Sequence, residues 1–312
     1  MSRLVRVAMT QTRNRYEPMP DTVDGLASLE GELEAIRAAN VDHHLELIES
    51  AAEAGAKIVG LGELFPAPYF ALEQRPGWRA MAEDAVNGPT VTALKEAAAR
   101  LEVVIVAPIY EVDPHTGERF NTAVVIDADG RWCGRYRKTH IPCGVNEQGE
   151  FHETFYYGAS DGAPQPDGAV VLGTNPFFPV FPTAVGNVGV AICFDRHFEG
   201  VMSSLKKAGA ELVFSPAITF GEKSMRMWAH EFPVDAMRHR LVICGSNRLG
   251  SEAPWDVTYP GGSYAVGPDG ALEDLSEISE LILVDAPLGG LAATDPAGWE
   301  IARNRRPEIY GS

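Results

Sequence analysis

Short apolar runs alternate along the chain with segments in which apolar residues recur at the spacing of an α-helix. Residues 5–9 form the first apolar run, residues 42–54 carry helical spacing, and residues 56–63 contain the next run. The other predicted strands cover residues 103–112, 122–130, 131–138, 188–192, 211–217 and 241–250, and the other predicted helices cover residues 90–101, 200–210 and 224–240. Strands that alternate with helices predict an α/β protein with a mixed sheet.

Two further segments complete this pattern. Residues 262–275 and 280–287 are strand-like and predict a closing hairpin. Residues 156–183 are rich in Gly and Pro, which predicts an elaborate surface loop beside a functional site. No shift in composition marks a domain boundary, so we expect residues 1–312 to form a single domain.

Composition and charge narrow the class of protein. The chain has 45% hydrophobic and 22% charged residues and a formal net charge of -17, which is typical of a globular protein. Nucleic-acid binding relies on clustered Lys and Arg, so we expect no nucleic-acid partner. The N-terminus lacks a signal-peptide pattern and no apolar run reaches about 18 residues, so we expect a cytoplasmic protein with no membrane partner.

The cysteines indicate thiol chemistry rather than disulfide bonds. The chain contains four of them, Cys133, Cys143, Cys193 and Cys244. They are too few for a disulfide scaffold and form no C-x-x-C pair. We therefore expect reduced thiols, which leaves Cys193 free to act as a nucleophile.

Cys193 is the candidate nucleophile because of what surrounds it. It follows the apolar run at residues 188–192, and Asp195, Arg196 and His197 come directly after it. Ionisable groups beside a thiol at the end of a strand control its reactivity. Taken alone, the residue could equally be a buried, inert core cysteine.

A cysteine nucleophile needs a general base and a donor for the oxyanion that its attack creates. Glu63 follows the apolar run at residues 56–63, and Lys138 ends the predicted strand at residues 131–138. Each has an ordinary alternative: a solvated loop glutamate, and a lysine whose ammonium group stays at the surface.

Taken together, these segments resemble the nitrilase superfamily of carbon-nitrogen hydrolases. The matching pieces are "GELF" with Glu63, "RKTHIP" with Lys138 and "VGVAICFDRHF" with Cys193, and the similarity extends over most of the chain. The resemblance implies a four-layer α-β-β-α sandwich, in which two sheets face each other and helices cover the outside. It also implies a homo-oligomer built on dimers, with contacts that we expect to include the C-terminal hairpin and tail.

The resemblance also assigns the catalytic roles. It makes Cys193 the nucleophile, Glu63 the general base and Lys138 the cation that stabilises the tetrahedral intermediate. The backbone N–H of Phe194 is placed to be a second donor to the oxyanion. A second glutamate of the family, which orients the lysine and contacts the substrate nitrogen, corresponds to Glu153.

Only the resemblance selects Glu153 within its acidic loop. Glu147 and Glu150 lie in the same loop, and the residues alone do not distinguish the three glutamates. Without the family, all three could be solvated charges.

Within the superfamily, the sequence is most similar to beta-ureidopropionase and the N-carbamoyl amino acid amidohydrolases. Arg196 is the informative residue, since a guanidinium group can hold a substrate carboxylate with two parallel hydrogen bonds. A salt bridge from Arg196 to Asp195 or to a more distant acid is the alternative. We expect Phe194, His197 and Tyr69 to line the substrate pocket beside it.

Two features depart from the beta-ureidopropionase pattern. Phe194 and Asp195 replace an expected tyrosine and glycine, and "CGVNEQGE" enlarges the loop ahead of Glu153. The reaction class is unaffected, but the identity of the substrate side chain is left open.

These observations predict an amidohydrolase that cleaves the N-carbamoyl group of an amino acid, a small molecule, and releases ammonia and carbon dioxide. The alternatives are an amidase or nitrilase for a small neutral substrate, and a catalytically silent binding module. His140, His152 and His197 form no H-x-x-x-H pair, so we expect no metal and no other cofactor.

Overall fold

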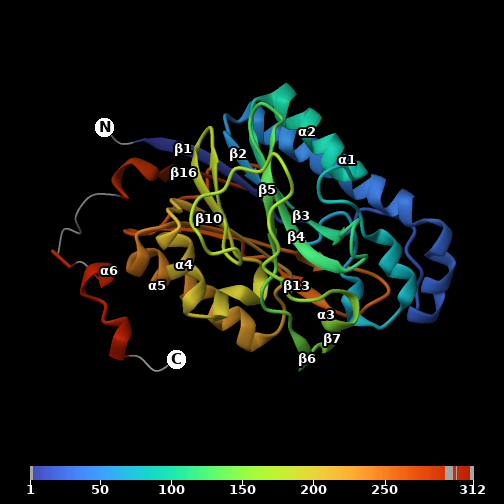
Figure 1. The fold of residues 1–312 in the computed structure, drawn as a ribbon. Helices are drawn as coiled ribbons and strands as arrows, with labels where there is room; N and C mark the ends of the chain where they lie inside the picture. The colour runs from blue at the N-terminus through green and yellow to red at the C-terminus, as the bar shows by residue number, and fades with distance from the viewer. Residues whose placement is uncertain (1–2, 292–297, 300, 310–312) are drawn as a thin grey trace.

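Two six-stranded sheets face each other in the computed structural model, which describes residues 3–291, 298–299 and 301–309 (Figure 1). The first sheet contains, in spatial order, β16 (Leu281–Pro287), β1 (Leu4–Thr10), β2 (Ile58–Gly60), β3 (Val104–Val112), β4 (Arg119–Ile126) and β5 (Trp132–Arg137). The second contains β15 (Gly270–Ala271), β14 (Tyr264–Gly267), β11 (Val242–Asn247), β10 (Leu212–Ala217), β9 (Gly186–Val190) and β8 (Val180–Thr183). The predicted sandwich of two facing sheets is confirmed.

Helices cover the outer face of each sheet. On the first sheet lie α1 (Leu33–Glu53) and α2 (Pro89–Leu101), and on the second lie α4 (Gly200–Lys207) and α5 (Glu222–His239) (Figure 1). In β1, Val7 and Met9 belong to the core between the sheets, whereas Ala8 belongs to the core under α1 and α2. This alternation places one apolar face of the strand in each core, which is why four layers form.

The two sheets approach each other closely at Gly60. A Cβ atom at this position would lie 2.2 Å from Cδ1 of Phe214 on the opposite sheet. Only a residue without a side chain fits there. Since β2 ends at Gly60, the close approach also fixes the place from which the following loop leaves the sheet.

Two of the predicted elements differ in the structure. Helix α1 begins at Leu33 rather than at residue 42, because its first turns bury Ile36 and pair the largely buried Arg37 with Glu83 at 2.9 Å. The predicted closing hairpin is wrong in its second half: β14 pairs with β15, whereas β16 crosses to the other sheet and pairs antiparallel with β1.

The segment from Tyr157 to β8 is largely irregular, as the prediction of a surface loop requires. It lies along the edge strand β5, where Val170 N–H donates to the carbonyl of Cys133 and the Gln165 side chain bonds both backbone groups of Arg135. The loop therefore satisfies backbone groups that an edge strand would otherwise expose.

Three short pieces lie beside this loop near the end of β5. They are the hairpin of β6 (Cys143–Asn146) and β7 (Gly149–His152), followed at once by the one-turn helix α3 (Glu153–Tyr156). A second small hairpin joins β12 (Leu249–Ser251) to β13 (Thr258–Pro260). These pieces surround the ends of the central strands.

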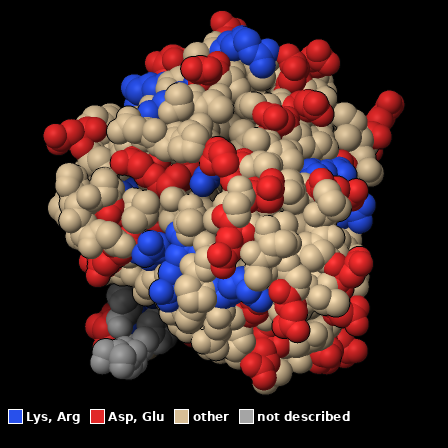
Figure 2. Space-filling view, turned by 90° about the vertical axis from the view of Figure 1, so that its right-hand side faces the viewer, with Lys and Arg blue, Asp and Glu red and all other residues tan. Residues whose placement is uncertain are grey.

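The surface carries acidic side chains over the whole of the face shown in Figure 2, with basic side chains between them. Within the described ranges, no helix combines the length and the apolar character needed to cross a membrane. The predicted role of the C-terminal tail in oligomer contacts partly concerns residues 292–297, 300 and 310–312, which lie outside the described residues.

Candidate active site

Three charged side chains meet between the ends of the two sheets. Glu63 follows β2, Lys138 follows β5, and Glu153 opens α3. The Lys138 ammonium lies 2.8 Å from Oε1 of Glu63 and 2.6 Å from Oε2 of Glu153. All three side chains are almost completely buried, so the structure brings together three residues that are far apart in the sequence.

The Glu63 carboxylate is held by donors from both sheets. Its Oε1 accepts a hydrogen bond from the Asn121 side-chain amide at 2.8 Å, and its Oε2 accepts one from the backbone N–H of Ile218 at 2.7 Å. Arg248 donates to the backbone carbonyl of Glu63 at 3.2 Å. These contacts fix the carboxylate in one orientation toward Lys138.

Asn121 is a site residue that the sequence analysis missed. It is completely buried in β4, donates to Glu63 and lies 3.4 Å from the Tyr157 hydroxyl, and its backbone carbonyl accepts from the N–H of Lys138 at 2.8 Å. The sequence offered one signal for Asn121, which is its position as a polar residue directly before the predicted strand at residues 122–130. That signal is weak, because polar residues at strand ends are common.

Cys193 lies at the point where the chain leaves β9. Its φ of +49° lies in the left-handed region, which is uncommon for a residue with a side chain, and it begins a short 3-10 turn, Cys193–His197. The carbonyl of Cys193 accepts a hydrogen bond from Arg196 Nη1 at 2.8 Å. The strained backbone is therefore supported by the side chain three residues later.

The electrostatic environment keeps the thiol protonated and the lysine charged. Burial and the nearby Glu63 raise the pKa of Cys193 to about 12, although Lys138 and Arg196 act in the opposite direction. Burial alone would lower the pKa of Lys138, but Glu153 and Glu63 outweigh it and raise the pKa above the ordinary value. The resting site thus combines a neutral thiol with a permanent cation.

Glu153 and Tyr69 form the next part of the site. The Tyr69 hydroxyl donates to Oε1 of Glu153 at 2.9 Å, while Oε2 of the same carboxylate contacts Lys138. Burial and the Glu153 charge raise the pKa of Tyr69 well above its ordinary value, so the phenol stays a donor. Tyr69 therefore orients Glu153 in addition to lining the cavity.

Arg196 and His197 both contact Glu231, a residue of α5 that the sequence analysis did not select. Arg196 Nε lies 3.2 Å from Oε2 of Glu231, and His197 Nδ1 lies 2.6 Å from Oε1. The Arg196 guanidinium also lies over the Trp228 ring at 5.1 Å. The alternative interpretation of Arg196, a salt bridge to a more distant acid, is thus present, with Glu231 as the partner.

Asp195 has partners of its own. Its carboxylate accepts hydrogen bonds from the Tyr136 hydroxyl at 2.6 Å and from the backbone N–H of His140 at 3.0 Å, and it lies 2.8 Å from His140 Nδ1. These contacts tie the turn after Cys193 to the segment that follows Lys138. His152 lies near Glu150 at 3.4 Å, so His140, His152 and His197 each contact a different acid.

A small cavity of about 90 Å³ lies over these groups. Its lining includes the predicted residues Cys193, Glu153, Arg196, His197, Phe194 and Tyr69, together with Pro142, Asn146, Phe151, Ile218, Thr219, Phe220 and Ser224. A nucleophile, a carboxylate beside a buried cation, and largely apolar walls are what cysteine-dependent hydrolysis of a small substrate requires.

Comparison with known proteins agrees with this geometry. A family model of carbon-nitrogen hydrolases matches residues 26–295. The chain belongs to the carbon-nitrogen hydrolase family. It is therefore an enzyme that hydrolyses carbon-nitrogen bonds other than peptide bonds, and the predicted membership of the nitrilase superfamily is confirmed.

Individual relatives support the same assignment. The chain is 30% identical over 289 residues to N-carbamoylputrescine amidase of Oryza sativa subsp. japonica, covering 88% of this chain and 89% of that protein. It is 34% identical over 207 residues to beta-ureidopropionase of Arabidopsis thaliana, covering 66% of this chain and 46% of that protein. The crystal structure of a carbon-nitrogen hydrolase from Helicobacter pylori G27 shares the fold of this hydrolase with a TM-score of 0.78 at 22% identity, over 98% of this chain and 97% of that one.

Proposed function

We propose that this carbon-nitrogen hydrolase removes the terminal carbamoyl group of an N-carbamoyl compound through a thioester on Cys193. The observation that carries the proposal is the buried Lys138 ammonium, held between Glu63 and Glu153 beside the cavity that Cys193 lines. A pKa of about 12 for Cys193 means that its proton must leave as the sulfur attacks.

Glu63 accepts that proton while the Cys193 sulfur bonds to the ureido carbon. Lys138 and the backbone N–H of Phe194 stabilise the negative charge on the ureido oxygen. The bond to the terminal nitrogen then breaks, and ammonia leaves with the proton from Glu63.

Water completes the cycle. Glu63 takes a proton from the water molecule as its oxygen attacks the thioester carbon, and the proton returns to the sulfur as the carbon-sulfur bond breaks. The product carbamate loses carbon dioxide to give the free amine. One ureido group and one water thus become an amine, ammonia and carbon dioxide.

The names of relatives favour this substrate class. N-carbamoylputrescine amidase, beta-ureidopropionase and citrullinase are each similar to this chain at 28% to 34% identity. An amidase or nitrilase for a small neutral substrate would use the same Cys193, Glu63 and Lys138, so the substrate panel below separates the two.

The contacts of Arg196 bear on which group the substrate carries on its other ureido nitrogen. An N-carbamoyl amino acid, the substrate predicted from the sequence, would place its carboxylate on this guanidinium. In the structure, however, Arg196 Nε already faces Glu231, and Arg196 Nη1 already donates to the backbone carbonyl of Cys193. This arrangement favours a second candidate, the N-carbamoyl derivative of an amine that lacks a carboxylate.

Ammonia release from a panel of substrates tests the proposal. The panel contains N-carbamoyl-beta-alanine, N-carbamoylputrescine, citrulline, propionamide and a small nitrile. We expect kcat/KM for the best carbamoyl compound to exceed that for the amide and the nitrile by more than about tenfold. Faster turnover of the amide or nitrile would contradict it.

Arg196→Gln then separates the two carbamoyl candidates. If Arg196 holds a carboxylate, this variant loses about 2–5 kcal/mol of transition-state binding for carboxylate substrates and much less for neutral ones. An equal loss on both classes would show that Arg196 acts by supporting the turn at Cys193.

A further inference from the structure

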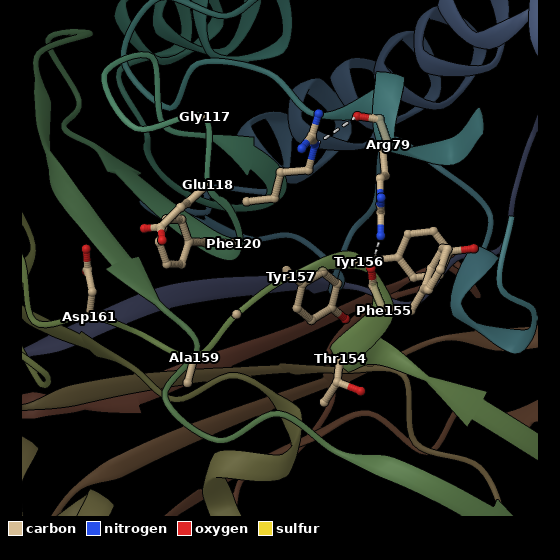
Figure 3. A pocket seen from close by; sticks show the side chains of 12 residues that line it. Arg79, Gly117, Glu118, Phe120, Thr154, Phe155, Tyr156, Tyr157, Ala159 and Asp161 are labelled. Atoms are coloured by element: carbon tan, nitrogen blue, oxygen red, sulfur yellow. Dashed lines mark hydrogen bonds between the residues drawn. The ribbon is translucent and has the colours of Figure 1, made fainter. Parts of the chain in front are cut away.

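A second cavity shares α3 with the catalytic cavity, since Thr154, Phe155 and Tyr156 line it whereas Glu153 lines the catalytic one. It has a volume of about 380 Å³, larger than the catalytic cavity. Its walls come from the 3-10 helix Pro76–Met81, the turn between β3 and β4, and residues 154–161 (Figure 3). The proposed reaction uses no residue of these walls, and cavities of this size accommodate small molecules.

Two arginines, Arg79 and Arg119, line this cavity. Arg79 donates from Nη2 to the carbonyl of Phe155 at 2.7 Å, and its guanidinium lies over the Phe155 ring at 4.4 Å from the centroid. Arg119 donates from Nε to the carbonyl of Arg79 at 3.3 Å. Two backbone carbonyls and one aromatic ring thus hold the guanidinium groups of Arg79 and Arg119 in place. No carboxylate of the described chain takes part in these contacts.

Both arginines are half-buried, and neither forms an ion pair within the described part of the chain. Arg137, which stacks on the Phe120 ring of the same cavity, shows the usual alternative, because it pairs with Glu111, Asp113 and Asp161. In a chain with 43 acidic and 26 basic residues, two neighbouring arginines without an acidic partner are unexpected. The unpaired positive charge therefore points to an anion from outside the chain.

The acidic groups of the cavity do not neutralise this charge. Asp161 is already paired with Arg137 at 3.1 Å, and Glu118 is exposed to solvent. In Figure 3, Glu118 and Asp161 lie on one side of the cavity, whereas Arg79 and Phe155 lie on the other. An anionic group would be attracted to the side with the arginines.

We propose that this cavity binds a small organic anion whose carboxylate or phosphate group contacts Arg79 and Arg119. Planar guanidinium groups present pairs of N–H donors that match the oxygens of either anion. The volume exceeds that needed by an inorganic ion alone, and the half-buried Phe155 ring offers apolar surface for the remainder of the ligand, whereas Tyr156 and Tyr157 also line the cavity but are almost completely buried.

Isothermal titration of the whole protein with inorganic phosphate, and separately with succinate, tests the proposal and distinguishes the two anion chemistries. We expect at least one of them to bind. Arg119→Gln and Arg79→Gln should each weaken that binding by about tenfold or more, because one charged contact is lost. Arg119→Lys, which keeps the charge but not the paired donors, should weaken it less than Arg119→Gln.

Lys57→Gln is the matched control, because it removes one exposed positive charge just before β2, where the Lys57 carbonyl accepts from the N–H of Val104 at the opposite end of β3 from this cavity. Its binding should equal that of the wild type, and thermal unfolding checks that every variant is folded. Binding of neither anion by the wild type would overturn the proposal. Equal binding by the wild type and by both glutamine variants would also overturn it, since the anion would then occupy another site.

Discussion

Strand β5 separates two clusters of buried charges that differ in their charge balance. On the side facing the second sheet, Lys138 lies between Glu63 and Glu153, so one cation serves two carboxylates. On the opposite side, Arg135 and Arg137 face the buried Glu111 and Asp113, and Arg137 also contacts the partly exposed Asp161, so two cations meet two buried carboxylates and one at the surface. Arg137, the last residue of β5, and Lys138, which follows it, thus enter two different electrostatic environments.

Arg135, Arg137, Glu111 and Asp113 form the outer cluster, in which each charge already has a partner within the chain. Arg137 donates to Glu111 at 2.6 Å and 3.1 Å and to Asp113 at 2.6 Å, and Thr122 donates to Glu111 at 2.5 Å. Although burial acts against it, pairing with Arg137 lowers the pKa of Asp113 to about 2. Every charge has a permanent partner, so this cluster has a structural role.

Lys138, Glu63 and Glu153 form the inner cluster, in which one cation faces two carboxylates. Its excess carboxylate lies beside a protonated thiol and a cavity, where a proton can move during a reaction. The charges of the inner cluster adjoin a cavity that a substrate can enter, whereas no residue of the outer cluster lines that cavity.

Removal of the sulfur should have the largest effect. We expect Cys193→Ala to fold normally and to lose nearly all turnover, because no other group beside Lys138 can form the thioester. Ammonia release and thermal unfolding measure the two properties. Cys143→Ala and Cys244→Ala are the matched controls and should stay active, and robust hydrolysis by Cys193→Ala would exclude the covalent mechanism.

Removal of the inner cation should affect catalysis first. Lys138→Met should lower kcat by roughly a hundred- to a thousandfold, because the oxyanion loses a charged donor that is worth about 3 kcal/mol. Steady-state kinetics on the best carbamoyl substrate measures the change. A kcat within a few-fold of the wild type would mean that the charge of Lys138 is not used in the reaction.

Removal of an outer cation should affect stability instead. Arg137→Met should lower the free energy of unfolding by about 3–5 kcal/mol, because Glu111 and Asp113 lose a buried partner. Urea unfolding measures this loss. The folded fraction should keep kcat/KM within a few-fold of the wild type, whereas a thousandfold loss of activity without loss of stability would erase the distinction between the two clusters.

Asn121 should have a smaller effect. Asn121→Ala removes a hydrogen bond to the Glu63 carboxylate, so the carboxylate loses one of the contacts that fix its orientation toward Lys138. We expect a tenfold to hundredfold loss of kcat/KM at neutral pH, equivalent to about 1–3 kcal/mol. Asn175→Ala in the surface loop is the control, and a kcat/KM of Asn121→Ala within a few-fold of the wild type would assign Asn121 a purely structural role.

The smallest effect concerns the resting thiol. Because burial raises the pKa of Cys193 to about 12, its reactive thiolate should be scarce at neutral pH, and alkylation by iodoacetamide should accelerate steadily as the pH rises. Mass spectrometry can compare Cys193 with Cys143, which is exposed in the same molecule. Faster alkylation of Cys193 than of Cys143 near neutral pH would show that the inner cluster already holds a thiolate.

The parts of the site that sequence reasoning reached are those at the ends of apolar runs. Glu63, Lys138 and Cys193 each end such a run, and their roles become specific once the three are considered together. Glu153 required the family resemblance, because Glu147 and Glu150 lie in the same acidic loop. The alternation of strands and helices predicted an α/β protein with a mixed sheet, whereas the four α-β-β-α layers were implied only by the family resemblance.

The spacing of apolar residues is a local property, so it was enough to predict most of the strands and helices. Packing determines that β16 joins β1, that Asn121 reaches Glu63, and that Glu231 rather than Asp195 faces Arg196. Each of these pairs depends on how two sheets and a helix pack against each other. Such contacts join residues far apart in the chain, and their energies appear only when burial removes water from both partners.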